Sequence, residues 1–213
     1  RIMMKLIMFG PPGAGKGTQT DILCRRYGIQ KISTGDALRE VIRSGSELGQ
    51  QVKGLMDQGK FVPDEIVTEI IRDRVSSPDC ANGFILDGFP RNLAQAEALL
   101  NMGIRMNKAL LINVPDEVLV ERVQGRVVCS KCGASYHVTN NPPQEEGVCD
   151  KCGGCLEARS DDRPETVRAR LKTYHELTDP VVDFYRGRGI LSEIDGTADI
   201  ETATAEILKI LEG

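Results

Sequence analysis

The residues best suited to chemistry lie near the start of the chain, in the segment GPPGAGKGTQ at residues 10–19. Glycines at this spacing, followed by Lys16, are typical of a loop whose backbone N–H groups turn towards phosphate oxygens while the lysine reaches the outer phosphates. The apolar run at residues 3–9 predicts a buried parallel strand before the loop, and residues 15–27 show a helical pattern after it. This context favours a phosphate site over an ordinary glycine-rich turn.

The position after Lys16 bears on the metal that accompanies a nucleotide. The general loop pattern has Ser or Thr there to contact magnesium, whereas this chain has Gly17. A carboxylate elsewhere must then help to place the ion. The apolar segment at residues 83–88 includes Asp87 at the expected carboxyl edge of a parallel sheet, where ligands bind. Asp87 is therefore the first candidate, and Asp36 is the second.

A second group of residues is suited to binding a metal directly. Four cysteines form two CxxC pairs with sixteen residues between the pairs, a spacing typical of a zinc site. They are Cys129, Cys132, Cys149 and Cys152. Four thiolates leave no open position, so we expect a structural zinc ion, with iron as the alternative. Cys155 could replace Cys152, although the spacing favours a free thiol, and His137 is a weaker alternate ligand.

Short apolar runs alternate with helical patterns and must supply the scaffold for these residues. Residues 83–88, 108–114 and 189–195 predict further buried strands, which indicates parallel βαβ units and an α/β fold. Two segments interrupt the alternation. Residues 33–62 are helical with several glycines, and residues 126–162 are rich in glycine, proline and cysteine. We expect both to be small insertions over the ligand edge of the sheet.

Composition and charge restrict the partners of this 213-residue chain. A net charge of −4, no tryptophan and few aromatic residues argue against a nucleic-acid binder. No apolar run approaches the length of a membrane span, and residues 1–9 lie too close to the glycine loop to be a removable signal peptide. Cysteine pairs of the kind that bind a metal favour a reducing, cytoplasmic location. We also expect a monomer. Cys24 and Cys80 are expected to be inert thiols.

Three segments together resemble the signatures of the nucleoside monophosphate kinases. They are GPPGAGKGTQ, ISTGDALR at residues 32–39 and LDGFPR at residues 86–91. Within that family the chain is most similar, over nearly its whole length, to the long-lid, zinc-binding bacterial adenylate kinases, in which GKGT is the usual form of the loop. The resemblance implies a P-loop fold with a five-stranded parallel sheet flanked by helices. It also implies reversible Mg²⁺-dependent phosphoryl transfer from ATP to AMP, giving two ADP.

The resemblance also divides the chain and implies its binding residues. Residues 1–32, 63–125 and 163–213 form the P-loop core, residues 33–62 the AMP-binding insertion, and residues 126–162 the zinc-binding lid. The residues implied for ATP are Gly13, Ala14, Gly15, Lys16, Gly17, Thr18, Arg122, Arg126, Ser135, Tyr136 and Ala198. Those implied for AMP are Thr34, Arg39, Phe61, Val62, Gly88, Phe89, Pro90, Arg91, Gln95, Arg159 and Arg170.

Phosphoryl transfer depends on positioning and charge stabilisation more than on acid–base groups. A nucleoside monophosphate is already mostly ionised near neutral pH, so it needs no general base, and arginine forks suit two anionic substrates. The catalytic residues implied by the resemblance are Lys16, Arg91, Arg126, Arg159, Arg170 and Asp87. Arg159 and Arg170 would bridge the transferring phosphoryl group, and Asp87 and Asp36 would hold Mg²⁺ through water. Arg163 and Arg168 are expected to be surface charges.

Other functions remain open from the sequence. A related nucleoside monophosphate kinase would use UMP, CMP or GMP as acceptor, or GTP as donor. The resemblance at Thr34 favours AMP as the acceptor. A zinc-ribbon binding module would carry basic and aromatic residues around its cysteines, but this segment is rich in acidic residues. A GTPase-like switch would carry a hydroxyl after Lys16. The acceptor assay distinguishes these functions.

Overall fold

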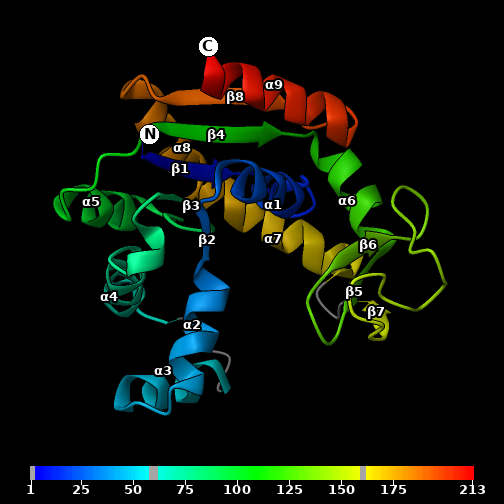
Figure 1. Ribbon diagram of the computed structural model, residues 1–213, viewed down its shortest axis with the longest axis horizontal. Helices are drawn as coiled ribbons and strands as arrows, with labels where there is room; N and C mark the ends of the chain where they lie inside the picture. Colours follow the sequence, from blue (N-terminus) through cyan, green and yellow to red (C-terminus); the bar gives the residue numbers. More distant parts are fainter. Residues whose placement is uncertain (1–2, 58–61, 159–161) are drawn as a thin grey trace.

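The computed structural model describes residues 3–57, 62–158 and 162–213. Its centre is a five-stranded parallel sheet with strand order β2-β3-β1-β4-β8 (Figure 1). The strands are β1 (Met4–Phe9), β2 (Gln30–Ser33), β3 (Gly83–Asp87), β4 (Lys108–Asn113) and β8 (Leu191–Asp195). The predicted α/β class is confirmed. The apolar pattern did not mark β2, because this edge strand has only four residues, QKIS, and a single buried one.

Helices cover both faces of this sheet. In β1, Leu6 and Met8 pack with α1 (Lys16–Tyr27), α6 (Asp116–Gln124), α7 (Pro164–Leu177) and α9 (Ile200–Glu212). Ile7 and Phe9 point to the other face, against α4 (Asp64–Val75), α5 (Leu93–Asn101) and α8 (Asp179–Gly187). Successive side chains of a strand point to opposite faces, so a strand buried on both faces is apolar throughout. Within the described residues, no helix has the length and apolar character needed to cross a bilayer.

Two smaller parts extend from this core (Figure 1). The first is the helix pair α2 (Thr34–Arg43) and α3 (Glu47–Asp57), which follows β2 directly. The second is a separate antiparallel sheet of order β6-β5-β7, built from β5 (Arg126–Cys129), β6 (Ser135–His137) and β7 (Leu156–Ala158). These strands were not predicted, because three or four residues are too few to show a periodicity. A short 3₁₀ helix, η1 (Pro78–Cys80), precedes β3.

The strand register brings the predicted chemistry to one edge of the sheet. Asp87, the last residue of β3, is paired with Met8 of β1 on one side and with Ser33 of β2 on the other. The carboxyl ends of parallel strands meet at the same edge, so the glycine loop after β1 and Thr34 after β2 lie on either side of Asp87. Ligands of open α/β sheets bind at this edge.

A histidine connects the helices that flank the smaller sheet. His175 of α7 has its Nε2 3.0 Å from Asp116 Oδ1 and its Nδ1 2.8 Å from Asp179 Oδ2. Asp116 begins α6, which leads into β5, and Asp179 begins α8. The hydrogen bond with Asp116, then that with Asp179, raises the pKa of His175 above its ordinary value. His175, near the end of α7, therefore connects the starts of α6 and α8, and these contacts favour its charged form.

We expect His175→Asn to destabilise the protein more at acidic than at alkaline pH. The folded-state pKa is raised, so the stabilisation is complete below the ordinary pKa of 6.5 and is lost as pH rises through the folded-state pKa. Because these side chains are nearly half exposed, the maximum effect is about 0.5–1 kcal/mol. Urea unfolding of both proteins between about pH 6 and about pH 9 measures it.

Lys172→Gln is the matched control, because Lys172 forms an exposed ion pair with Glu176 on the same helix. Because this variant changes no histidine, we expect its effect to stay constant over this pH range. A His175→Asn effect that is equally constant would show that the imidazolium contributes no charge-dependent stability.

Candidate active site

The glycine loop has the backbone conformation that anion binding requires. Gly13 and Gly15 have φ angles of 87° and 88°, a region that L residues rarely adopt. Gly13 also contacts α6 closely, since a Cβ there would lie 2.7 Å from Val123 Cγ2. Glycine is therefore needed at residue 13 for both conformation and space. The loop leads directly into α1, whose N-terminal N–H groups and dipole favour a bound anion.

Lys16 and Asp87 meet at the base of this loop. The Lys16 ammonium group forms an ion pair with Asp87 Oδ1, and the Asp87 side chain is only 10% exposed. Lys31 Nζ lies 3.9 Å from Asp87 Oδ2 and 3.1 Å from Asp21 Oδ1. Burial alone would lower the pKa of Lys31, but its hydrogen bond to Asp21 and the charges of Asp21 and Asp87 outweigh burial and raise it. Lys16 and Lys31 thus offset the charge of the buried Asp87 carboxylate. Lys31 was not predicted as a site residue, because it belongs to none of the recognised motifs.

The segment 88–91 after β3 is held by its neighbours on two sides. Arg91 Nε and Thr34 Oγ1 both donate to the Gly88 carbonyl oxygen, at 2.7 and 2.9 Å. The Arg91 backbone N–H donates to Gln95 Oε1 at 2.8 Å, and Gln95 Nε2 donates to Asp64 Oδ1 at 2.7 Å. Three predicted site residues, Thr34, Arg91 and Gln95, are thereby brought together. Asp64 was not predicted, and only the structure shows that it positions Gln95.

Other predicted residues of this region lie nearby or outside the described chain. Arg39 and Asp36, one turn apart on α2, form an ion pair in which both side chains are more than half exposed. Asp36 is therefore engaged with Arg39, while Asp87 is engaged with the lysines. Phe89 is almost fully buried in the core. Phe61 and Arg159 lie outside the described residues.

Arginines from two elements converge on one buried carboxylate. Arg126, the first residue of β5, donates from Nε to Asp162 Oδ2 at 2.9 Å and from Nη2 to Oδ1. Arg170 of α7 has its Nη1 3.9 Å from Asp162 Oδ1. The Asp162 side chain is only 6% exposed. Asp162 had no predicted role, because an acidic residue at the end of a segment without periodicity carries no local signal.

The loop after β8 lies at the same edge of the sheet. The Gly196 N–H donates to the Asn113 carbonyl oxygen at the end of β4, at 2.9 Å. Gln19 of α1 donates from Nε2 to the Ile200 carbonyl oxygen at 3.2 Å. Ala198, between these two anchors, therefore lies in a loop fixed beside the glycine-loop helix. Arg122 of α6 contributes, after Thr197, to lowering the pKa of Asp195 at the end of β8.

The four predicted cysteine ligands come together in the small sheet. Their Sγ atoms all lie within 4.8 Å of one another. The pairs Cys129–Cys152 and Cys132–Cys149 are each 3.5 Å apart. Zn–S bonds of about 2.3 Å place the sulfur atoms of a regular tetrahedron about 3.8 Å apart. The arrangement therefore fits a four-thiolate metal site. Gly154 allows the close approach, since a Cβ there would lie 2.8 Å from Cys129 Sγ.

Tyr136 contacts the cysteine cluster, whereas the two alternative ligands, Cys155 and His137, lie outside it. Tyr136 Oη lies 3.5 Å from Cys149 Sγ and accepts a hydrogen bond from the Asp150 N–H at 2.9 Å. The Tyr136 hydrogen bond lowers the pKa of Cys149 to about 6. Cys155 is exposed and lies outside the cluster. His137 Nδ1 instead accepts hydrogen bonds from two backbone N–H groups, at residues 139 and 140.

The two remaining cysteines have the properties of inert thiols. Burial, followed by the charge of Asp21, raises the pKa of Cys24 to about 11. Burial also raises the pKa of Cys80, whose exposure is 3%. Both thiols are therefore protonated at neutral pH, which agrees with the expectation from sequence.

Comparison with known proteins agrees with this geometry. The sequence profile described as adenylate kinase matches residues 8–190. The chain belongs to the adenylate kinase family. It is 53% identical to an adenylate kinase of Caldicellulosiruptor bescii over 212 residues, which cover 98% of this chain and 99% of the relative. It is likewise 53% identical to one of Archaeoglobus fulgidus, covering 98% of both chains. An adenylate kinase of Carboxydothermus hydrogenoformans is 51% identical, covering 98% of this chain and 100% of the relative. The family predicted from the sequence is therefore confirmed.

Asp162→Asn is expected to lower the free energy of unfolding by about 1–2 kcal/mol. The substitution removes a buried charge to which Arg126 and Arg170 are both attracted, and it leaves their guanidinium groups facing a neutral amide. Urea unfolding measures the change. The control is Glu157→Gln on β7, which makes the same change in charge at an exposed position and should have an effect below about 0.5 kcal/mol. Equal small effects in both variants would contradict the role of Asp162.

Proposed function

We propose that this chain acts as an adenylate kinase, catalysing reversible Mg²⁺-dependent transfer of a phosphoryl group from ATP to AMP to give two ADP, and so serving adenine nucleotide homeostasis. The observation that carries the proposal is the meeting of Lys16, Asp87 and the Arg91 segment at one edge of the sheet, in a chain of the adenylate kinase family. A glycine loop alone would support many phosphate ligands. The adjoining segment 88–91, which includes Arg91, would add a second anion-binding site beside it.

The donor nucleotide is proposed to lie along the glycine loop. Its phosphates would receive hydrogen bonds from the loop backbone, and Lys16 would exchange its contact with Asp87 for phosphate oxygens. The residues proposed for ATP are Gly13, Ala14, Gly15, Lys16, Gly17, Thr18, Arg122, Arg126, Ser135, Tyr136 and Ala198. Because the Tyr136 side chain is committed to the cysteine cluster, the Ser135–Tyr136 contact would be made by the backbone.

The acceptor nucleotide is proposed to lie between α2 and α5. The hydrogen bonds of Thr34 and Gln95 with segment 88–91 support this placement, because they fix Arg91 before a ligand arrives. The residues proposed for AMP are Thr34, Arg39, Phe61, Val62, Gly88, Phe89, Pro90, Arg91, Gln95, Arg159 and Arg170. The exposed Arg39 is free to turn from Asp36 to a phosphate, since exposed ion pairs contribute little stability.

The proposed chemistry is in-line transfer between two anions that repel each other. AMP is already ionised near neutral pH, so positioning and charge compensation suffice. Arg91, Arg126, Arg159 and Arg170 would supply that compensation together with Lys16. Mg²⁺, when bound, neutralises phosphate charge, and Asp87 and Asp36 are proposed to hold it through water. The absence of a hydroxyl at Gly17 and the carboxylate at the sheet edge support this assignment.

Two parts of the chain are proposed to close over the substrates. They are the AMP-binding insertion at residues 33–62 and the lid at residues 126–162, with residues 1–32, 63–125 and 163–213 as the core. The separate sheet of β5, β6 and β7 supports the lid boundary. Closure would exclude water, which otherwise competes with AMP as the acceptor.

The lid is proposed to contain one structural zinc ion bound by the four clustered cysteines. Among its described residues the hydrophobic cluster has only four buried ones, two of them cysteines, which is too little apolar contact to fix such a segment. Zinc would supply the missing cross-link. Seven unpaired cysteines support a reducing, cytoplasmic location. Of the exposed large apolar side chains in the described chain, only Leu93 and Leu100 share an element, α5, and this limited clustering supports a monomer.

The first test is ADP formation from MgATP with AMP, UMP, CMP and GMP supplied separately. We expect rapid transfer to AMP alone, and Arg91→Ala should lower kcat about 100-fold or more because a phosphate-binding guanidinium is lost. Arg168→Ala, at an exposed position of α7, is the control and should retain activity. Preference for another monophosphate would contradict the acceptor. Equal losses in both variants would contradict the role of Arg91.

The zinc proposal predicts one zinc ion per chain, measured by elemental mass spectrometry on the purified protein. Cys149→Ser should lose the ion and lower the melting temperature, because the cross-link of the small sheet is broken. Cys155→Ser should keep both the ion and the melting temperature of the wild type. Iron in place of zinc would keep the cage but overturn the choice of metal, and loss of metal in Cys155→Ser would overturn the ligand set.

A further inference from the structure

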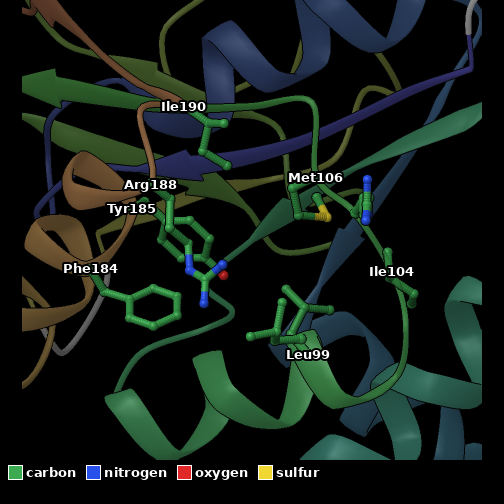
Figure 2. Close-up of a pocket in the computed structure, with 9 residues that line it drawn as sticks. Leu99, Ile104, Met106, Phe184, Tyr185, Arg188 and Ile190 are labelled. Carbon is green, nitrogen blue, oxygen red and sulfur yellow. The ribbon is translucent and has the colours of Figure 1, made fainter.

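A second cavity lies at the opposite edge of the sheet from the candidate active site. It has a volume of about 330 Å³ and is bounded by α5, the segment before β4 and α8. Its apolar walls come from Leu99, Ile104, Met106, Phe184, Tyr185 and Ile190 (Figure 2). Ile104 and Met106 precede β4 and Ile190 precedes β8, at the amino ends of these strands, whereas the glycine loop follows the carboxyl end of β1. None of the residues assigned to ATP or AMP lines this cavity.

The cavity also carries three polar groups that form no ion pair or hydrogen bond with the described residues. Arg105 and Arg188 line it, and neither forms an ion pair with any described residue. Arg188 Cζ lies 4.5 Å from the centroid of the Phe184 ring. The Tyr185 side chain is only 5% exposed, and its hydroxyl has no hydrogen-bond partner in the described part of the chain. Figure 2 shows Tyr185 of α8 and Arg188, the residue that follows this helix, on the side of the cavity opposite Leu99 and Met106.

Arg186, two residues before Arg188, shows that the arginines of this region are not all without ion pairs. Arg186 lies outside the cavity and is paired with Asp183 on its own helix and, at 2.6 Å, with Glu193. The cavity lining contains no acidic residue, although acidic residues outnumber basic ones in the chain, 31 to 27. Positive charge is thus concentrated at the rim of an apolar cavity.

We propose that this cavity binds a small amphipathic carboxylate. The apolar part of the ligand would lie against Leu99, Ile104 and Ile190, and its carboxylate would be held by Arg188 and Arg105 with a hydrogen bond from Tyr185. Guanidinium groups match the two oxygens of a carboxylate in a planar fork.

Other ligand classes use only part of this site. A cation would be repelled by the two arginines, and a neutral apolar molecule would leave them without a counter-charge. A strongly hydrated inorganic anion would leave the apolar walls uncovered. Cavities that bind small molecules typically measure about 300–1,000 Å³, so this one admits only a small ligand.

The test uses octanoate as the probe and follows the methyl resonances of the wild-type protein by NMR. We expect saturable shifts of Leu99, Ile104, Met106 and Ile190 that persist with saturating ATP and AMP, because the two edges of the sheet are separate. Octanol and octylamine carry the same chain with a neutral and a positive head, and both should bind at least fivefold more weakly, by roughly the contribution of a charge-assisted contact. Absence of saturable shifts at about 20 mM octanoate, or equal binding of the three probes, would overturn the proposal.

Variants locate the carboxylate. Arg188→Gln and Arg105→Gln should each weaken octanoate binding about fivefold, whereas Arg186→Gln, two residues from Arg188 but outside the cavity, should leave it unchanged. All three positions are exposed, so the variants should fold. Equal affinity in Arg188→Gln and Arg186→Gln would overturn the assignment of the carboxylate to the cavity rim. Displacement of octanoate by ATP or AMP would overturn the separation of this site from the nucleotide site.

Discussion

The ion pair between Lys16 and Asp87 is the contact on which the arrangement of the site depends. Asp87 ends a strand that lies between β1 and β2, so its carboxylate is nearly buried and needs positive charge close by. Lys16 comes from the loop after β1, and Lys31 comes from β2 itself. The same register that pairs the three strands thus brings together the groups that neutralise Asp87. The positions of these charged groups at the edge of the sheet therefore follow from the hydrogen bonding between the strands.

A second buried carboxylate has the corresponding role in the smaller part of the molecule. Asp162 attracts Arg126 from the start of β5 and Arg170 from α7, which are cations that would otherwise repel each other. Each of the two acids therefore holds a pair of basic side chains in place before any anionic ligand is present. Charges fixed in advance stabilise a transition state without reorganisation during the reaction. Neither histidine of the chain is among the predicted site residues, which agrees with a reaction that needs no general base.

Local sequence patterns predicted the parts of this site that are determined locally. The glycine loop, the strand that ends in Asp87 and the cysteine pairs are recognisable because their spacing along the chain is itself the requirement. Asp162 is 36 residues from Arg126, and nothing near it in the sequence indicates that contact. Strand β2 was missed because an edge strand with polar side chains has no apolar run. The spacing favoured Cys152 over Cys155 as the fourth ligand but did not determine it. The structure decides, because it places the thiol of Cys152 in the cluster.

The strand order has a consequence for how the chain folds during synthesis. The central strand β1 forms hydrogen bonds with β3 and β4, but not with β2, which follows it in the sequence. Its first partner, β3, begins only at Gly83, so the most apolar strand of the N-terminal region emerges from the ribosome well before anything can pair with it. Closing so long a loop is slow compared with forming α1 or α2. The nascent chain therefore carries an exposed, aggregation-prone strand until β3 is made, and the arrival of β3 is the event that first encloses a core.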